Sequence, residues 1–170
     1  WNNKHWSFIK NFVWWACQNI LPTKSNLYRR QVINSEVCEL CDKSCETTSH
    51  VLLHCDFSLS IWETCGLVID RECTFDDMFW KLNNGSGPSA VDITHFMAIS
   101  WNIWNNSNVI RQGEKLKTVA TLIIEATRVA VDYQSVQDYP IPAANLLPTR
   151  WTPSITGVYK ANVDCAVFRD

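Results

Sequence analysis

The feature that most constrains this chain is a group of cysteine and histidine residues between positions 38 and 55. Two residues separate Cys38 from Cys41, eight separate Cys41 from His50, and four separate His50 from Cys55, which gives C-x2-C-x8-H-x4-C. A two-residue gap lets a tight turn direct both thiolates at one ion, and zinc prefers four tetrahedral sulfur and nitrogen ligands. The pattern predicts a structural Zn²⁺ site with no open position for water.

Two neighbouring residues compete for places in this site. Cys45 could replace one of the thiolates, and His54 is adjacent to Cys55. We favour His50 over His54, because neighbouring residues of a helix project in different directions. The alternative to a metal site is a set of ordinary buried cysteines with two incidental histidines. The chain has eight cysteines, a number that would indicate disulfides in a secreted protein, but no signal peptide precedes them.

The composition predicts a folded, soluble protein. Hydrophobic residues make up 46% of the 170 residues and charged residues 19%, a balance unlike that of disordered chains. The most apolar stretch, residues 96–104, is too short to cross a bilayer. The net charge of −2 provides no global basic field, so any contact with nucleic acid must rest on local patches.

Most of the chain has helical periodicity. Apolar residues recur at three- and four-residue spacing in the first segment, which we expect to be a helix ended by Pro22. They are Trp6, Ile9, Val13, Cys17 and Ile20. Thr23 can cap a short second helix. Its apolar residues are Leu27, Tyr28 and Val32.

Four more helices are predicted beyond the cysteine cluster. The first carries apolar residues from Val51 to Trp62 and stops near Gly66. The others are expected at 75–82, 91–110 and 115–134, with a loop at 83–88. Helical spacing favours a core position for five of the nine tryptophans. These are Trp6, Trp14, Trp62, Trp101 and Trp104.

The last part of the sequence has a different pattern. Residues 139–153 contain four of the six prolines and are typical of an extended linker. From Val158 to Phe168, apolar and polar residues alternate, as in a β-strand. A lone strand cannot bury its faces, so we expect a domain that begins here and is truncated. Residue 1 is a tryptophan, which also favours a fragment.

Several blocks of the sequence resemble the zinc-binding domain of plant non-LTR retrotransposon reverse transcriptases. The blocks are Phe12–Trp14, Ile20–Thr23, Leu27, Arg29–Arg30, Cys38–Cys41, Glu46–Thr47, His50–Cys55, Ile61–Trp62 and Trp101–Trp104. The sequence departs from the family at Trp15, where an arginine is usual, and at 105–107, where basic residues are usual. These changes leave the zinc ligands intact.

A second resemblance lies near the end of the chain. Trp151–Pro153, Gly157 and Lys160–Asp164 look like the opening of the ribonuclease H-type domain that follows in many such polyproteins. The resemblance implies that Asp164 is the first of the carboxylates that bind catalytic Mg²⁺. Hydrolysis by two metal ions needs several converging carboxylates. With Asp164 alone, we expect no cleavage of RNA and regard an exposed acid on an edge strand as the alternative.

We therefore predict a mainly α protein, a small zinc-stapled helical domain with a helical spacer and an orphan strand of a truncated α/β domain. The predicted division is a zinc-binding domain at 1–70, a spacer at 71–135, a proline-rich linker at 136–153 and the strand at 154–170.

The predicted function is that of a nucleic-acid-associated accessory module of a retrotransposon reverse transcriptase, structural rather than catalytic. RNA or an RNA–DNA hybrid is the expected partner, with Arg29 and Arg30 as candidate phosphate contacts, although the sequence alone favours solvated surface charge as their explanation. No membrane and no small-molecule substrate are expected, and the expected location is nuclear or cytoplasmic. The alternatives are a ribonuclease H fragment whose other carboxylates lie beyond residue 170, and a decayed element copy without function.

Overall fold

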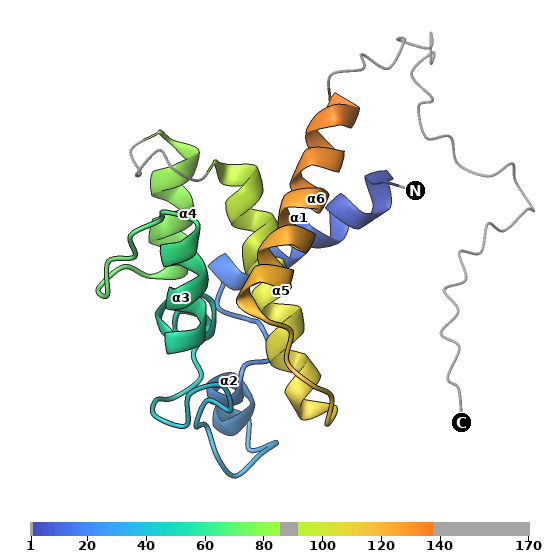
Figure 1. The fold of residues 1–170 in the computed structure, drawn as a ribbon. Helices are drawn as coiled ribbons and strands as arrows, with labels where there is room; N and C mark the ends of the chain where they lie inside the picture. Colours follow the sequence, from blue (N-terminus) through green and yellow to red (C-terminus); the bar gives the residue numbers. More distant parts are fainter. Residues whose placement is uncertain (1, 86–91, 138–170) are drawn as a thin grey trace, which may run out of the picture. The chain divides into compact units, whose positions relative to one another are not determined.

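The computed structural model describes residues 2–85 and 92–137, which belong to one compact unit of the chain. Its helices are α1 (Asn2–Cys17), α2 (Lys24–Arg29), the π-helical turn η1 (His50–His54), α3 (Asp56–Thr64), α4 (Phe75–Asn83), α5 (Ile93–Arg111) and α6 (Val119–Gln137) (Figure 1). In this part of the chain the only β-structure is an isolated bridge between Val37 and Cys45. None of the described helices combines the length and the apolar character needed to cross a membrane.

The predicted mainly helical class is confirmed for the described residues. The predicted strand at 154–170, Asp164 and nearly all of the linker at 136–153 lie outside them. The division into domains at 1–70 and 71–135 stays a prediction.

Helix α5 lies at the centre of the packing, and it contacts α1, α4, α6 and η1. Its fully buried Phe96 stacks against Trp62 of α3 and Phe75 of α4, with ring centroids 5.1 and 5.4 Å apart. Nearer its C-terminal end, Trp101 meets the edge of Phe12 of α1 at 5.2 Å. Burial of large rings contributes most of the hydrophobic stabilisation available to a core of this size. Phe96, Trp62 and Phe75 thus form an aromatic cluster that joins α5 to α3 and α4, and the contact of Trp101 with Phe12 joins α5 to α1.

The helix ends follow the capping residues in the sequence. The side chain of Thr23 accepts a hydrogen bond from the Asn26 amide and caps α2, as predicted. Helix α3 ends where Gly66 adopts a left-handed conformation with φ of 74°, and Leu67 N–H donates to Trp62 C=O at 2.8 Å. Glycine adopts that conformation without steric cost, so the predicted stop at Gly66 is confirmed.

The predicted first helix is wrong at its C-terminal end and on one face. Helix α1 ends at Cys17, and Asn19 takes a positive φ of 52°, so Ile20 leaves the apolar stripe and is 43% exposed. Trp14 was expected in the core but is 58% exposed. Its neighbour Val13 faces the core, and successive residues of a helix are rotated by about 100°.

The other tryptophan predictions mostly hold. Trp6, Trp62 and Trp104 are buried, and Trp101 is half-buried against the core. The second helix is shorter than predicted, because α2 ends at Arg29 before Val32, and both Tyr28 and Val32 are exposed. The buried residue of α2 is Asn26, whose side-chain amide donates to the carbonyls of Asn19 and Leu21. Those two hydrogen bonds satisfy its buried N–H groups.

Removing the ring at the centre of the aromatic cluster should destabilise the whole unit. We expect Phe96→Ala to lower the free energy of unfolding by about 3–5 kcal/mol, because a large cavity forms between α3, α4 and α5. Phe8→Ala is the matched control, since Phe8 is 60% exposed; its effect should stay within about 0.5 kcal/mol. Urea denaturation followed by circular dichroism measures both. Equal effects of the two substitutions would contradict the assignment of the core.

Candidate metal centre

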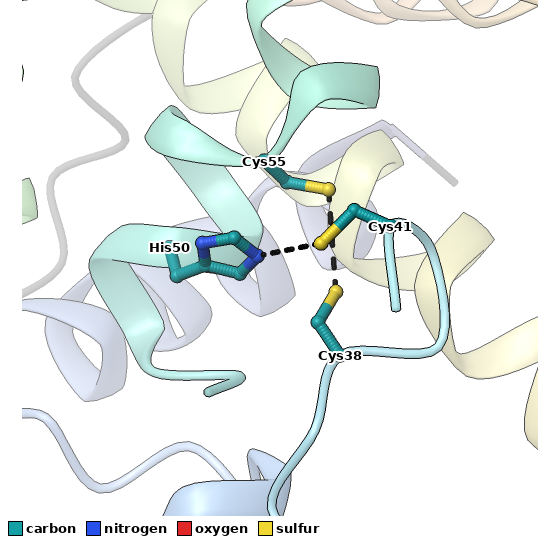
Figure 2. Close-up of side chains that lie close together, drawn as sticks. All are labelled: Cys38, Cys41, His50 and Cys55. Carbon is teal, nitrogen blue, oxygen red and sulfur yellow. Dashed lines mark hydrogen bonds between the residues drawn. The ribbon is translucent and has the colours of Figure 1, made fainter. Parts of the chain in front are cut away.

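The segment between α2 and η1, residues 30–49, is called the cysteine loop below. Four potential metal ligands meet at one point between this loop and the start of α3 (Figure 2). Cys38 and Cys41 come from the loop, His50 from η1, and Cys55 from the junction of η1 and α3. Their donor atoms all lie within 4.8 Å of one another. The Sγ atoms of Cys38 and Cys55 are 4.0 Å apart, and Cys41 Sγ is 3.4 Å from His50 Nε2. The structure thus brings together the four residues that the spacing predicted.

A tight turn directs the first two sulfur atoms to the same side. The Asp42 amide donates to the Cys38 carbonyl at 2.8 Å, and the Cys38 amide donates to the Ser44 carbonyl at 2.8 Å. Asp42 takes a positive φ of 53°, a conformation that aspartate tolerates better than most residues. The antiparallel bridge between Val37 and Cys45 closes the base of this turn.

A π-helical turn positions the other two donors. The Cys55 amide donates to the His50 carbonyl at 2.7 Å, so the turn contains one residue more than an α-helical turn. In an α-helix, residues five positions apart project about 140° away from each other. The wider turn reduces that angle, and the extended backbone of Cys55 lets its thiol face the imidazole of His50. Periodicity alone did not reveal this turn.

The separations between the donors fit a zinc ion. With Zn–S bonds of about 2.3 Å and Zn–N bonds of about 2.0–2.1 Å, tetrahedral geometry places two sulfurs about 3.8 Å apart and a sulfur and a nitrogen about 3.6 Å apart. The observed 4.0 and 3.4 Å lie within a few tenths of an ångström of these values. Three sulfurs and one imidazole nitrogen are also the donor types that zinc prefers. The cluster could therefore hold Zn²⁺ with all four positions filled by protein.

The electrostatics of the cluster favour a cation at its centre. Cys38 and Cys55 are buried. The hydrogen bond to Cys55, together with burial, raises the pKa of Cys38 to about 12. The same hydrogen bond lowers the pKa of Cys55, and a hydrogen bond to Cys38 raises the pKa of His50. Without an ion the cluster retains protons, whereas a divalent cation stabilises the thiolates in their place.

The two competing residues lie outside this cluster. Cys45 is exposed, and a hydrogen bond to Glu36 raises the pKa of its thiol. His54 is half-buried, its Nε2 atom has no hydrogen-bond partner among the described residues, and burial lowers its pKa. Arg29 and Arg30, the candidate phosphate contacts, also lie outside the metal cluster, and both are exposed at the end of α2.

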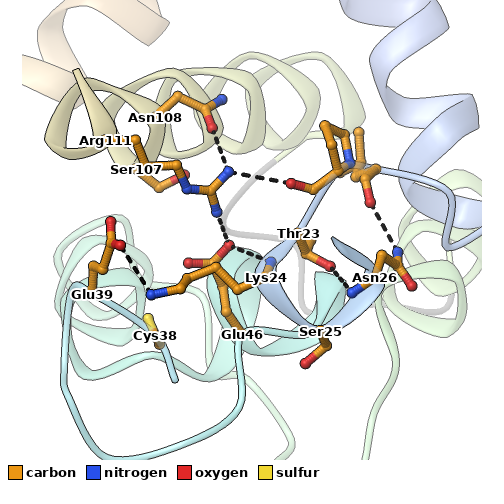
Figure 3. Close-up of polar contacts among 12 residues, drawn as sticks. Thr23, Lys24, Ser25, Asn26, Cys38, Glu39, Glu46, Ser107, Asn108 and Arg111 are labelled. Carbon is orange, nitrogen blue, oxygen red and sulfur yellow. Dashed lines mark hydrogen bonds and ion pairs between the residues drawn. The ribbon is translucent and has the colours of Figure 1, made fainter. Parts of the chain in front are cut away.

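Beside the metal centre the structure shows a polar network around the buried carboxylate of Glu46 that sequence reasoning missed (Figure 3). Glu46 is 2% exposed and forms an ion pair with Arg111 at the end of α5. It also accepts a hydrogen bond from the Lys24 amide at 3.1 Å. Arg111 in turn donates to the carbonyl of Pro22 at 3.2 Å. This network connects the cysteine loop, α2 and α5, but its partners are far apart in sequence and no local pattern indicates it.

The fold and the site define a small helical module with a closed Cys3His cluster. Residues 1–62 match the sequence family described as zinc-binding in reverse transcriptase. The matched segment contains α1, α2, the cysteine loop and most of α3, and hence all four donors of the cluster. A search of curated proteins found no match, and neither did a search of solved structures.

The metal centre can be tested with two cysteines that differ in placement but lie in the same loop. The purified chain should contain about one equivalent of zinc, and Cys38→Ser should lose it together with helical signal, because one of four ligands is removed. Cys45→Ser should keep the zinc, since Cys45 lies outside the cluster. Elemental analysis and circular dichroism give the two readouts. Zinc loss in both variants, or in neither, would contradict the assignment of these ligands.

The Glu46 network gives a separate prediction about stability. Arg111→Ala leaves the buried carboxylate without its cationic partner, so we expect a loss of about 3 kcal/mol in the free energy of unfolding. Adding Glu46→Gln should recover part of that loss, because a neutral amide costs less to bury. Arg128→Ala, on the exposed face of α6, is the control. Chemical denaturation of the zinc-loaded proteins measures the effects, and an Arg111→Ala protein as stable as the control would contradict the role of the pair.

Proposed function

We propose that this chain is a structural zinc-binding accessory module of a reverse transcriptase and that it associates with nucleic acid. The observation that carries the proposal is the closed Cys3His cluster, which lies within the segment that matches the reverse-transcriptase family. Zinc held by four protein ligands has no open position for water or substrate, so its contribution is to folding. Catalytic zinc sites keep one position for water, which this donor set does not provide.

The charges around the zinc module support nucleic acid as the partner. Lys24 is paired with Glu39 at 2.9 Å, and Lys43 is paired with Asp56 at 2.6 Å. Arg29 and Arg30, by contrast, are exposed side by side and form no ion pair among the described residues. Two exposed guanidinium groups at consecutive positions, neither paired with a carboxylate among the described residues, suit the phosphate backbone, which dominates the affinity of proteins for nucleic acid.

We further propose the narrower setting that the sequence resemblance implies. The module belongs to a non-LTR retrotransposon polyprotein of plant type, it acts in the nucleus or cytoplasm, and a ribonuclease H-type domain begins near residue 154. In that domain Asp164 would be one of several Mg²⁺ ligands. RNA or an RNA–DNA hybrid is the partner that fits both the polymerase and the nuclease of such a protein.

The proposal is tested by the binding of labelled RNA, DNA and RNA–DNA hybrid to the full chain, measured by fluorescence anisotropy at several salt concentrations. The zinc-loaded protein should bind at least one of them, with an affinity that decreases as salt increases. The Cys38→Ser protein should bind at least 10-fold more weakly, because the loop beside α2 loses its order. A folded, zinc-loaded chain that binds none of the three at low salt would overturn the proposal.

A further inference from the structure

An open polar pocket of about 400 Å³ lies beside the metal centre, between α2 and the cysteine loop. Helix α2 contributes Asn26, Tyr28 and Arg29 to its walls. The loop contributes Glu36, Cys45 and Thr47. The pocket therefore depends on the segment whose shape the four metal ligands determine.

The side chains of the pocket combine an aromatic surface with charges of both signs. Tyr28 is 48% exposed, more than is usual for a tyrosine. Arg29 donates to Asn26 Oδ1 at 3.1 Å, and Asn26 is itself fixed by its two bonds to backbone carbonyls. The guanidinium is therefore positioned at the pocket with further N–H donors available. On the loop side, the Glu36 carboxylate accepts from Ser25 Oγ at 3.1 Å and from the Cys45 thiol, and its remaining lone pairs can accept from a ligand.

We propose that this pocket binds one nucleotide of a single-stranded nucleic acid. The base stacks on Tyr28, the phosphate contacts Arg29 with Arg30 beside it, and the edge of the base faces Glu36. Stacking on an exposed aromatic ring next to a basic residue is the general means by which proteins bind single strands. A base within a duplex offers no free face to Tyr28, so single strands are the ligand. The inference rests on the proposed association with nucleic acid and specifies its site.

The carboxylate of Glu36 gives the pocket a preference among bases. Adenine, cytosine and guanine each carry an amino group that can donate to it. Thymine and uracil have no amino group, and their one free donor, N3–H, lies between two carbonyl oxygens that a carboxylate repels. Single strands of dC or dA should therefore bind more tightly than dT of the same length.

Two other exposed aromatic residues, Trp14 and Trp80, are placed less favourably for nucleic acid. Trp14 and Trp80 line an apolar groove of about 660 Å³ between α1 and α4. Asp76 and Asp77 stand at that groove, with Lys10 as the one basic residue among those that line it. Two carboxylates oppose the approach of phosphates. Of the two surfaces, only the pocket beside α2 places a ring next to an arginine without a carboxylate partner.

The test uses the full zinc-loaded chain and fluorescently labelled ten-nucleotide strands of dA, dC and dT. Tyr28→Ala should weaken the binding of dC about 10-fold or more, whereas Tyr28→Phe should leave it nearly unchanged because the ring remains. Arg29→Gln should weaken binding and reduce the slope of log affinity against log salt by about one. The matched controls are Phe8→Ala and Arg128→Gln, which alter exposed residues outside the pocket. Zinc content and circular dichroism verify the fold of each variant.

A separate measurement concerns the loop side of the pocket. Glu36→Gln should reduce the preference for dC over dT, because an amide can donate to a carbonyl of thymine as well as accept. This ratio stays informative even if Tyr28→Ala impairs folding.

The outcomes separate this inference from the function on which it rests. If the unaltered chain binds no strand, the association with nucleic acid fails. If it binds, but Tyr28→Ala and Arg29→Gln match their controls, the pocket is not the site and the broader function stands. A preference for dT, or a dC-to-dT ratio that Glu36→Gln leaves unchanged, would overturn the role of Glu36.

Discussion

The long loop between α2 and η1 has no hydrophobic core of its own, and the structure depends on the contacts that hold this loop in place. Between α2 and η1, the buried residues are Cys38, Glu46 and Thr48, and none is a large apolar side chain. Hydrophobic burial contributes about 1.5–3 kcal/mol for each large side chain, and this loop buries no such side chain. A structural zinc ion contributes an apparent 10–16 kcal/mol, roughly the total stability of a small domain. Coordination of Zn²⁺ by the four donors would thus be large enough to order this segment, in addition to the ion pair of Glu46 with Arg111.

The two pairs of donors in the metal centre are held in place by different contacts. His50 and Cys55 flank three fully buried residues, Val51, Leu52 and Leu53. Trp62 Nε1 donates to the Leu52 carbonyl at 2.8 Å, and Ser58 Oγ donates to the Val51 carbonyl at 2.6 Å, so α3 holds this turn against the core. Cys38 and Cys41 are held instead by the turn of the loop, in which the Asp42 amide donates to the Cys38 carbonyl and the Cys38 amide to the Ser44 carbonyl. The core thus fixes His50 and Cys55, whereas the hydrogen-bonded turn of the loop holds Cys38 and Cys41.

Features with a local cause were predictable from the sequence. The two-residue gap between Cys38 and Cys41, the cap at Thr23 and the stop at Gly66 each follow from the chemistry of a few neighbouring residues. The outward position of Trp14 was not predictable in this way, because its size favours burial while its place on the helix decides exposure. Glu46 and Arg111 are 65 residues apart, and a single sequence contains no sign that they meet. The π-helical turn at His50 is likewise determined by tertiary packing rather than by local propensity.

The position of Glu46 explains how the metal centre would affect a nucleotide in the neighbouring pocket. Its carbonyl accepts from the Ser25 amide at 3.2 Å, and its own amide donates to the Glu36 carbonyl at 2.8 Å. Glu46 therefore connects the start of α2 to the segment of the cysteine loop that contains Glu36. The charge of the metal centre would weaken the binding of a nucleotide. Zn²⁺ with three thiolates and a neutral imidazole carries a net charge of roughly −1, which repels phosphate. If zinc strengthens binding of a single strand, it does so through the shape of the loop that Glu46 joins to α2, and not through its charge.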